Sequence, residues 1–559
     1  MKHKRHLLRV LTAAVALAAV FVGAVGTAQA LVAPFDLQQL TDASQTVVLA
    51  QVVSAVPRWT IGAQPTIVTD VLLRVGEVLK GSAGQSLRLR LPGGRVGIAA
   101  VSVSDSPQLF AGQTYLLFLD STGNVVDGCG GAPQVTGGDV SALGDSLAGV
   151  AAKVSQTTGR DSLTLCSLSA ATPVIALFGA VTAAEADPRA GGPLITDVSP
   201  ARAAAGVGAK ITITGSGFGI VQGLGRVLFF TQPGQPGLDA RVVSWSDTSI
   251  VCRVPIGSVA GADAPSSGPL QVITGDGQTS NDVPFNVIFS FDQSQWAVAD
   301  CTFRVDARFP ARRLAAAVAA ATQTWNAAGT PLQFIDGGAS GPRAVLGDGY
   351  NDIVWSDGLP AGYSARTSTY TVGSCIIEAD TKLSTSVAWG DTSVDGSVTD
   401  LQTIVLHELG HWLGLRDLYG QNDIGKAMYG IRGVGDTYRS LSPADRGGKL
   451  WIYKAVRWDH APPTTTLRSA FARSGGFARL TLKIADHPYS CGAAKVTVFI
   501  RQGAGMVPWV TFDGLPIGVW QHPRFRCTLA SGTYQIATVA TDMAGNKQVG
   551  VKFQTLNVH

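Results

Sequence analysis

The chain contains one short run of residues whose types and spacing suit metal-dependent hydrolysis. His407 and His411 stand four positions apart, with Glu408 directly after the first of them. Residues i and i+4 lie on the same face of a helix, so both imidazoles can reach one metal ion. Glu408 then projects beside them and can take a proton from a water that the metal activates. Only eight His are present in the whole chain, so chance is a poor explanation for this spacing.

A catalytic zinc site usually has three protein ligands and one open position, so a third ligand is needed. No Glu follows Glu408, and the next His is His460, far beyond the helix and close to a predicted domain boundary. Asp417 stands six positions after the second His, and Gly414 lets the chain turn out of the helix before it. Elimination therefore predicts one catalytic zinc as the cofactor, with the ligands His407, His411 and Asp417.

The same segment resembles the metzincin metallopeptidases. The motif His407-Glu408-x-x-His411-x-x-Gly414-x-x-Asp417 is followed by Ala427-Met428-Tyr429-Gly430, where that clan has its Met-turn. Most matrixins have His where this chain has Asp417, whereas the snapalysin family of secreted bacterial peptidases has Asp. The surroundings are similar to matrixins, notably in Thr324-Trp325-Asn326, Asn351-Asp352-Ile353-Val354-Trp355 and Leu441-Ser442-Pro443-Ala444-Asp445.

This resemblance implies an α+β catalytic domain over residues 290–457 that hydrolyses peptide bonds. Glu408 would act first as the general base and then as the acid that protonates the leaving amine. Met428 would form a hydrophobic floor beneath the metal without binding it. Matrixins also hold a structural zinc, but no His stands between Cys301 and Leu406, so we do not expect that second zinc.

Calcium is a further expectation, with Asp336, Asp348 and Asp352 as candidate ligands. An Asp near a Gly is more often part of a turn, and this alternative stays open.

Two functions fit these residues. The first is a secreted zinc endopeptidase that acts on proteins or peptides and whose β modules bind or present the substrate. The second is an extracellular adhesion or binding protein in which the metzincin-like unit is weak or inactive. Cleavage specificity and oligomeric state cannot be read from the pattern. The role of residues 31–289 is equally open, because the Pro-Arg-Cys-Gly latency motif of matrixins is not present.

The elements that must position the motif form the most helix-rich part of the chain. Alanines with well-spaced Leu and Trp predict an amphipathic helix over residues 311–328. A second helix, which carries the two His, is expected to open at Thr399 with a capping box to Gln402. Runs of β-branched residues predict strands at 332–335, 351–355 and 376–381.

The rest of the chain is predicted to be all-β and to form three domains. Residues 31–190 show short β-branched runs between Gly and Pro turns, which indicates a small barrel or sandwich. Residues 193–289 resemble the IPT/TIG family, through Leu194–Pro200, Ile211–Phe218 and Trp245–Pro255, which implies an immunoglobulin-like sandwich. Residues 461–559 alternate again and end in Ala540-Thr541-Asp542-Met543-Ala544-Gly545-Asn546, which resembles bacterial Ig-like repeats.

The first 30 residues have the pattern of a secretory signal, with a basic start, an apolar run and Ala28-Gln29-Ala30 as the cleavage site. We therefore expect a protein that is secreted after cleavage behind Ala30. Four of the 43 basic residues lie in this segment, which has no acidic residue, so the remainder balances 39 basic against 39 acidic residues. A neutral chain has no electrostatic footprint for nucleic acid or an anionic membrane. The uncharged stretch Ser162–Ala184 contains Pro173, so no stable membrane anchor is expected there.

Seven cysteines suit an oxidising compartment. One pair within each of three domains is the simplest arrangement, and it predicts the disulfides Cys129–Cys166, Cys301–Cys375 and Cys491–Cys527. Cys252 stands in an apolar run and is expected to be a free buried thiol at a core position of its sandwich.

Overall fold

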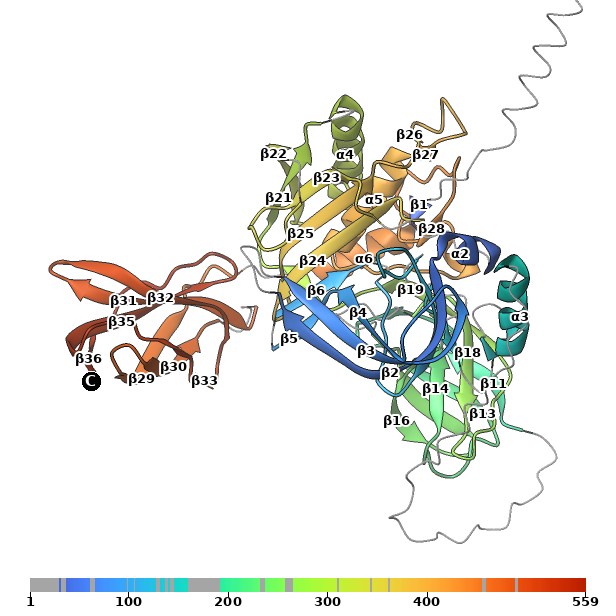
Figure 1. Ribbon diagram of the computed structural model, residues 1–559, viewed down its shortest axis with the longest axis horizontal. Helices are drawn as coiled ribbons and strands as arrows, with labels where there is room; N and C mark the ends of the chain where they lie inside the picture. Colours follow the sequence, from blue (N-terminus) through green and yellow to red (C-terminus); the bar gives the residue numbers. More distant parts are fainter. Residues whose placement is uncertain are drawn as a thin grey trace, which may run out of the picture.

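The computed structural model describes residues 30–31, 37–60, 66–97, 99–104, 106–126, 131–135, 139–140, 145–158, 192–231, 237–256, 265–308, 311–341, 344–359, 362–454, 459–487 and 491–559. Within these residues the chain is mostly β-sheet and contains five α-helices. Figure 1 shows the last strands (red) as a separate unit at one end of the molecule, while the three preceding units pack together. None of the described helices is both long enough and apolar enough to cross a membrane.

The first unit is a five-stranded sheet in the order β4-β3-β2-β7-β8. Its long central hairpin buries Val and Leu side chains on both faces, with Val48 and Leu73 in one core and Val47 and Leu79 in another. The helices α2 (Leu37–Ala43) and α3 (Leu147–Thr158) close a second small core beside it. The strands are β2 (Thr46–Trp59), β3 (Ile67–Lys80), β4 (Ser86–Pro92), β7 (Thr114–Leu119) and β8 (Gln134–Val135), with a small pair β9 (Asp139–Val140) and β10 (Asp145–Ser146).

The second unit has two sheets around one core, as the predicted sandwich requires. The sheet orders are β11-β13-β17-β16 and β12-β19-β18-β14-β15. Cys252 on β17 is fully buried and free, so its prediction as a core thiol is confirmed, and burial raises its pKa to about 12. The strands are β11 (Leu194–Ser199), β12 (Arg202–Ala205), β13 (Lys210–Ser216), β14 (Arg226–Phe229), β15 (Leu238–Asp239), β16 (Arg241–Trp245), β17 (Ser249–Arg253), β18 (Gly268–Ile273) and β19 (Val283–Ser290).

The third unit carries the helices and a sheet in the order β22-β21-β23-β25-β24. β24 is antiparallel to β25, while the other neighbours are parallel. Helix α4 packs against β21 and β22, α5 packs against β24 and β25, and the two helices contact each other. The strands are β21 (Asp300–Asp306), β22 (Gln333–Ser340), β23 (Asp352–Ser356), β24 (Ala365–Val372) and β25 (Cys375–Ser384), and the helices are α4 (Ala311–Asn326), α5 (Leu401–Trp412) and α6 (Pro443–Tyr453).

Short pieces complete this unit. They are β1 (Ala30–Leu31), which pairs with β28 (Ile431–Arg432), together with β20 (Gln295–Trp296), β26 (Trp389–Gly390), β27 (Thr399–Asp400) and the 3-10 turn η2 (Gln421–Asp423). The three strands expected here are present, but β21 and β24 were not predicted. The expected cap of the His-bearing helix was wrong by one residue. Asp400, rather than Thr399, is the N-cap of α5, because its carboxylate accepts the backbone N–H of Thr403 at 2.8 Å.

Two strands of the N-terminal segment extend the sheet of the helical unit. β6 (Ala99–Val103) pairs with β24 in antiparallel register, and β5 (Gly94–Val96) pairs with β6. Figure 1 shows β5 and β6 beside β24, far in sequence from the strand that they extend. The outer edge of the predicted catalytic sheet is therefore covered by residues from the first part of the chain.

The last unit is one eight-stranded sheet, with Leu, Ile and Val alternating into its core. The alternation noted in residues 461–559 is present in its strands, as in β30 and β31, whose buried and exposed residues alternate. The strands are β29 (Thr464–Ala472), β30 (Phe477–Ala485), β31 (Ala493–Gln502), β32 (Gly505–Pro516), β33 (Trp520–Gln521), β34 (Arg524–Arg526), β35 (Gly532–Asp542) and β36 (Gln554–Val558).

The predicted disulfide pairing within domains was wrong for the helical and C-terminal units. Cys375 is bonded to Cys491, with a Cα–Cα distance of 5.4 Å, while Cys301 and Cys527 are free and buried. The physical reason is that Cys375 stands at the β24–β25 turn, which lies against the C-terminal unit. Gly373 in that turn has φ +64° and leaves no room for a side chain beside the Cys491 carbonyl. The pair Cys129–Cys166 lies outside the described residues.

We expect Cys491→Ser to lower the free energy of unfolding by about 2–5 kcal/mol, because the bond closes a loop of 116 residues. Peptide mapping without reduction checks the connectivity directly. A peptide joining Cys375 to Cys491 is expected, and Cys252, Cys301 and Cys527 should react with an alkylating agent only after denaturation. A fragment that links Cys301 to Cys375 would contradict the assignment.

Candidate metal centre

The three predicted metal ligands lie together in the structure. His407 Nε2 is 3.1 Å from His411 Nε2 and 2.9 Å from Asp417 Oδ1, and His411 Nε2 is 3.4 Å from the same carboxylate oxygen. All three side chains are buried. Helix α5 places the two imidazoles on one face, and Gly414, at φ +82°, turns the chain back so that Asp417 meets them.

The hydrogen bonds of the two imidazoles determine which atoms face the centre. His407 Nδ1 lies 2.8 Å from the Ala427 carbonyl oxygen, and His411 Nδ1 lies 2.9 Å from the Leu415 carbonyl oxygen. A carbonyl only accepts, so each Nδ1 carries a proton and donates it. In the neutral rings both Nε2 atoms then present lone pairs, and no hydrogen bond reaches Asp417 Oδ1 within the described part of the chain. Two nitrogens and one oxygen directed at one point suit a zinc ion.

The charges of the group favour a cation at the same point. Burial opposes protonation of His411, yet the neighbouring Asp417 raises its pKa to about 9, so a proton takes the Nε2 position wherever a metal ion does not. Burial also opposes the ionised form of Asp417, but His411 and His407 hold the pKa of this carboxyl well below its usual range. Asp417 is therefore ionised at neutral pH and attracts positive charge to the point that it shares with the imidazoles.

Glu408 lies next to this centre and is 1% exposed. Its Oε2 accepts a hydrogen bond from the Thr367 hydroxyl at 2.5 Å, and Thr367 Oγ1 lies 2.7 Å from Thr381 Oγ1. Its Oε1 has no hydrogen-bond partner among the described residues. Burial raises the pKa of Glu408, while the charges of His411 and His407 oppose that rise. One carboxylate oxygen is thus anchored, and the other is free to exchange a proton.

Met428 packs against the helix turn between the two imidazoles. A Cβ atom on Gly410 would lie 2.1 Å from the Met428 sulfur, and it would also approach the ring of Trp325. Only glycine therefore fits at position 410 while the Met428 side chain, 2% exposed, occupies its place. The floor position that the resemblance implied for Met428 agrees with this packing.

Asp445 fixes the segment that contains Met428. Its carboxylate accepts the backbone N–H groups of Ala427 at 2.8 Å and Met428 at 3.3 Å, and it also caps α6 through Ser442. The Ala427 carbonyl in turn accepts from His407. The orientation of the His407 ring therefore depends on a carboxylate on a different helix.

The loop after Asp417 is held by the sandwich formed by β11–β19. Asp423 in this loop is fully buried and accepts from the Ser267 N–H at 2.9 Å and the Ser267 hydroxyl at 2.7 Å. The Arg416 N–H donates to the Ser290 carbonyl at the end of β19, at 3.0 Å. The third predicted ligand thus belongs to a segment that is hydrogen-bonded to a second domain.

The space beside His411 is small among the described residues. Ser102 on β6 and Ser104 directly after it, both nearly fully buried, line a space of about 10 Å³ together with His411 and Thr367. This volume holds about one water molecule.

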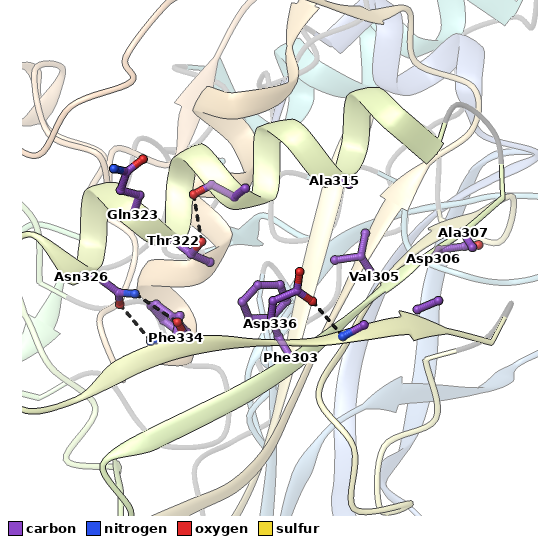
Figure 2. A pocket seen from close by; sticks show the side chains of 13 residues that line it. Phe303, Val305, Asp306, Ala307, Ala315, Thr322, Gln323, Asn326, Phe334 and Asp336 are labelled. Carbon is purple, nitrogen blue, oxygen red and sulfur yellow. Dashed lines mark hydrogen bonds between the residues drawn. The ribbon is translucent and has the colours of Figure 1, made fainter.

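Two other features of this unit are separate from the centre. A cavity of about 550 Å³ lies between α4 and the strands β21 and β22 (Figure 2), and its lining includes the calcium candidate Asp336 but no residue of the zinc centre. Its Asp336 accepts the N–H of Gly338 in a turn. Of the other two calcium candidates, Asp348 accepts the N–H of Tyr350, and Asp352 forms a two-point ion pair with Arg304. Calcium at these aspartates stays a prediction.

Three positioning residues were missed at the level of sequence. Thr367 lies on a strand that was not predicted, and no local pattern connects it to Glu408. Asp423 acts across a domain boundary. Asp445 could have been found, because Ser442-Pro443-x-Asp445 has the spacing of a capping box with Pro at the first helical position.

Comparison with known proteins identifies one domain of the chain. Residues 193–287 match the IPT/TIG domain family, so an IPT/TIG domain is present and its prediction is confirmed. A segment of 90 residues is 39% identical to human matrix metalloproteinase-25, and it covers 16% of this chain and 16% of that protein. The likeness to a metalloproteinase is therefore partial.

Likenesses to solved structures are distant. The S-layer protein rSbsC(31-844) is 9% identical, with a TM-score of 0.13, over 66% of this chain and 54% of that chain. A tetra-tandem repeat in the extending region of a large adhesion protein is 11% identical, with a TM-score of 0.13, over 92% of this chain and 93% of that chain. Neither carries weight for the fold.

We expect Asp445→Asn to loosen the centre without touching any of its predicted ligands. The amide has one acceptor atom in place of two, so at least one N–H of the Met428 segment loses its partner, at a cost of about 1–3 kcal/mol. Zinc affinity is expected to fall by roughly tenfold to a hundredfold. Competition with a chromophoric chelator measures that affinity. The exposed Asp300→Asn is the matched control, and equal affinities for the two variants would contradict the role of Asp445.

Proposed function

We propose that the protein is a zinc-dependent endopeptidase that acts outside the cell on protein or peptide chains. The observation that carries this proposal is the convergence of His407, His411 and Asp417 on one point, with the free oxygen of Glu408 beside it. The metzincin-like motif and the partial similarity to a human matrix metalloproteinase support it. The Cys375–Cys491 disulfide supports an oxidising compartment, as does the signal-like N-terminus.

The three ligands would hold the zinc ion, which supplies a polarised carbonyl and a water that ionises near neutral pH. In this proposal Glu408 is the general base and then the general acid. Its Oε2 is fixed by Thr367, so its free Oε1 keeps one orientation and can accept the proton of the attacking water. Burial raises the pKa of Glu408, so the acid form that results is able to protonate the leaving amine. Bond cleavage then leaves Glu408 ionised again, as it began.

The buried side chains around the centre also exclude bulk water from the reaction. His407, Glu408 and His411 are at most 5% exposed. In such surroundings the charge interactions between Glu408 and its neighbours are stronger than in water. The alternative function, an adhesion protein with an inactive peptidase-like unit, has no separate observation in its favour and is an outcome of the test below.

We expect Glu408→Gln to lower the rate of cleavage of a casein substrate by at least about a hundredfold, because the amide cannot accept the proton of water. Zinc content, measured by atomic emission, should stay at one ion per chain in this variant. Asp417→Ala is the comparison, and it is expected to lose both zinc and activity.

Equal cleavage by the parent and Glu408→Gln would contradict the catalytic assignment. A parent that binds zinc and cleaves nothing, even after β6 is displaced from β24, would favour the adhesion alternative. Full zinc retention by Asp417→Ala would show that another group is the third ligand.

A further inference from the structure

A second group of carboxylates lies at the entrance to the C-terminal sheet. Asp459 precedes β29, Asp486 follows β30 and Asp542 ends β35, so three separate segments meet here. One oxygen from each residue lies within 4.8 Å of the other two. Asp459 and Asp542 are 6% and 5% exposed, and Asp486 is half-buried. None of these residues belongs to the centre described above.

Two oxygens of this group have no partner. Asp459 Oδ2 and Asp486 Oδ2 are buried without a hydrogen bond from any described residue, while Oδ1 of each accepts a nearby backbone N–H. No ion pair between described residues includes any of the three aspartates. Burial, followed by repulsion from Asp459 and Asp542, raises the pKa of Asp486 to about 6. An unpartnered oxygen on a residue as buried as Asp459 is costly unless something positive compensates it.

We propose that Asp459, Asp486 and Asp542 bind a calcium ion. The group offers oxygen atoms alone, and three carboxylates at close range suit a hard divalent cation. Zinc is a poorer match, because it prefers nitrogen and sulfur ligands. The ion would tie the segment that leads into the domain to the ends of two core strands. Asn546 already joins two of these segments, since its Nδ2 donates to the Asp459 carbonyl at 2.7 Å and to Asp542 Oδ2 at 2.9 Å.

The test is the number of calcium ions bound per chain, measured by equilibrium dialysis of the full mature chain with zinc saturated. Asp486→Asn is the informative variant, because it is half-buried, keeps its shape and retains the oxygen that accepts from His487. We expect this variant to bind one calcium ion fewer than the parent at 1 mM calcium, roughly the free concentration at which extracellular calcium modules bind. Asp197→Asn, an exposed change on β11, should bind as many ions as the parent.

The count separates this site from any calcium bound elsewhere in the chain. Equal calcium numbers for the parent and Asp486→Asn would overturn the proposal. A parent that binds no calcium at all would also overturn it. The three carboxylates would then be stabilised by shared protons instead of a cation.

A different observation, the pairing of β6 with β24, carries a second inference, which rests on the proposed function. β24 is the outer strand of the sheet beside the centre, and its Thr367 donates to Glu408. The antiparallel pairing of β6 with β24 continues up to Thr367. The Ser104 N–H donates to the Thr367 carbonyl at 3.0 Å, and the Thr367 N–H donates to the Ser104 hydroxyl at 3.1 Å.

Side chains of the helical unit strengthen this pairing. Arg416, next to the predicted ligand Asp417, donates to the Ser102 hydroxyl at 2.8 Å, and Arg366 donates to the Ser104 carbonyl at 3.1 Å. Both serines are nearly fully buried. β6 therefore takes up the free backbone groups of β24 at the point where that strand is closest to Glu408. An extended peptide that added to this edge would need the same groups.

We infer that β6 keeps the peptidase latent by occupying the strand position that an extended peptide substrate needs. Release of β6 from β24 then opens the centre. This gives the N-terminal segment an inhibitory role that does not depend on a cysteine.

The test uses two variants of the full mature chain in the Glu408→Gln background. The first variant, Ser102→Pro with Ser104→Pro, removes the backbone N–H groups of Ser102 on β6 and of Ser104 directly after it. The second variant, Ser102→Ala with Ser104→Ala, keeps both N–H groups and removes only the hydroxyls. The probe is a fluorescent peptide hydroxamate of six residues, and its dissociation constant is measured by anisotropy. We expect the proline pair to bind at least about tenfold more tightly than the parent, and the alanine pair to stay within about threefold of it. Ser104→Pro alone is the fallback if the double variant does not fold.

Equal affinity in the parent and a folded proline variant would overturn the latency. The same serine variants, made in the chain that keeps Glu408, separate the latency from the proposed function. If the proline variant binds the probe more tightly but cleaves no substrate, the latency by β6 stands and the peptidase function is refuted. If the parent cleaves rapidly and the proline variant cleaves no faster, the peptidase function stands and the latency is refuted.

Discussion

The structure depends on one arrangement that is unfavourable without a positive charge. Two imidazole nitrogens and a carboxylate oxygen face one another at 2.9–3.4 Å, and the Nδ1 atoms of both rings are already committed to backbone carbonyls. Lone pairs at this distance repel unless a proton on His411 or a metal ion lies between them, and burial removes the water that would screen them. Such a group persists only where the surrounding structure holds each member in place.

That surrounding structure comes from several domains. His407 is oriented by Ala427, whose segment is held by Asp445. Asp417 lies in a loop held by Ser267 of the IPT/TIG domain and by Ser290, shortly after that domain. The IPT/TIG domain is therefore part of the support of the centre, and its role is more than that of a spacer. Removal of this domain would leave the buried carboxylate of Asp423 without its partners at Ser267.

The sequence was informative wherever the chemistry is local. The spacing of His407 and His411 on a helix, the turn at Gly414 and the alternation of the β strands all follow from backbone geometry. The third ligand could be predicted by elimination because Glu and His are scarce nearby. What could not be predicted is non-local. Pairing of Cys375 with Cys491, and of β6 with β24, joins segments more than 100 residues apart, and no periodicity contains that information.

The edge strand β24 connects these non-local contacts. Its Thr367 end touches Glu408 and Ser104, and its Val372 end pairs with Cys375, which is bonded to the C-terminal domain. A strand fixed at both ends is a rigid template, so a peptide or β6 that pairs with it is placed relative to Glu408 without further ordering. The same rigidity means that β24 cannot shift to admit a substrate alongside β6. Only one strand can occupy the edge at a time, so the release of β6, rather than movement within the sheet that contains β24, is the step that would control access to the centre.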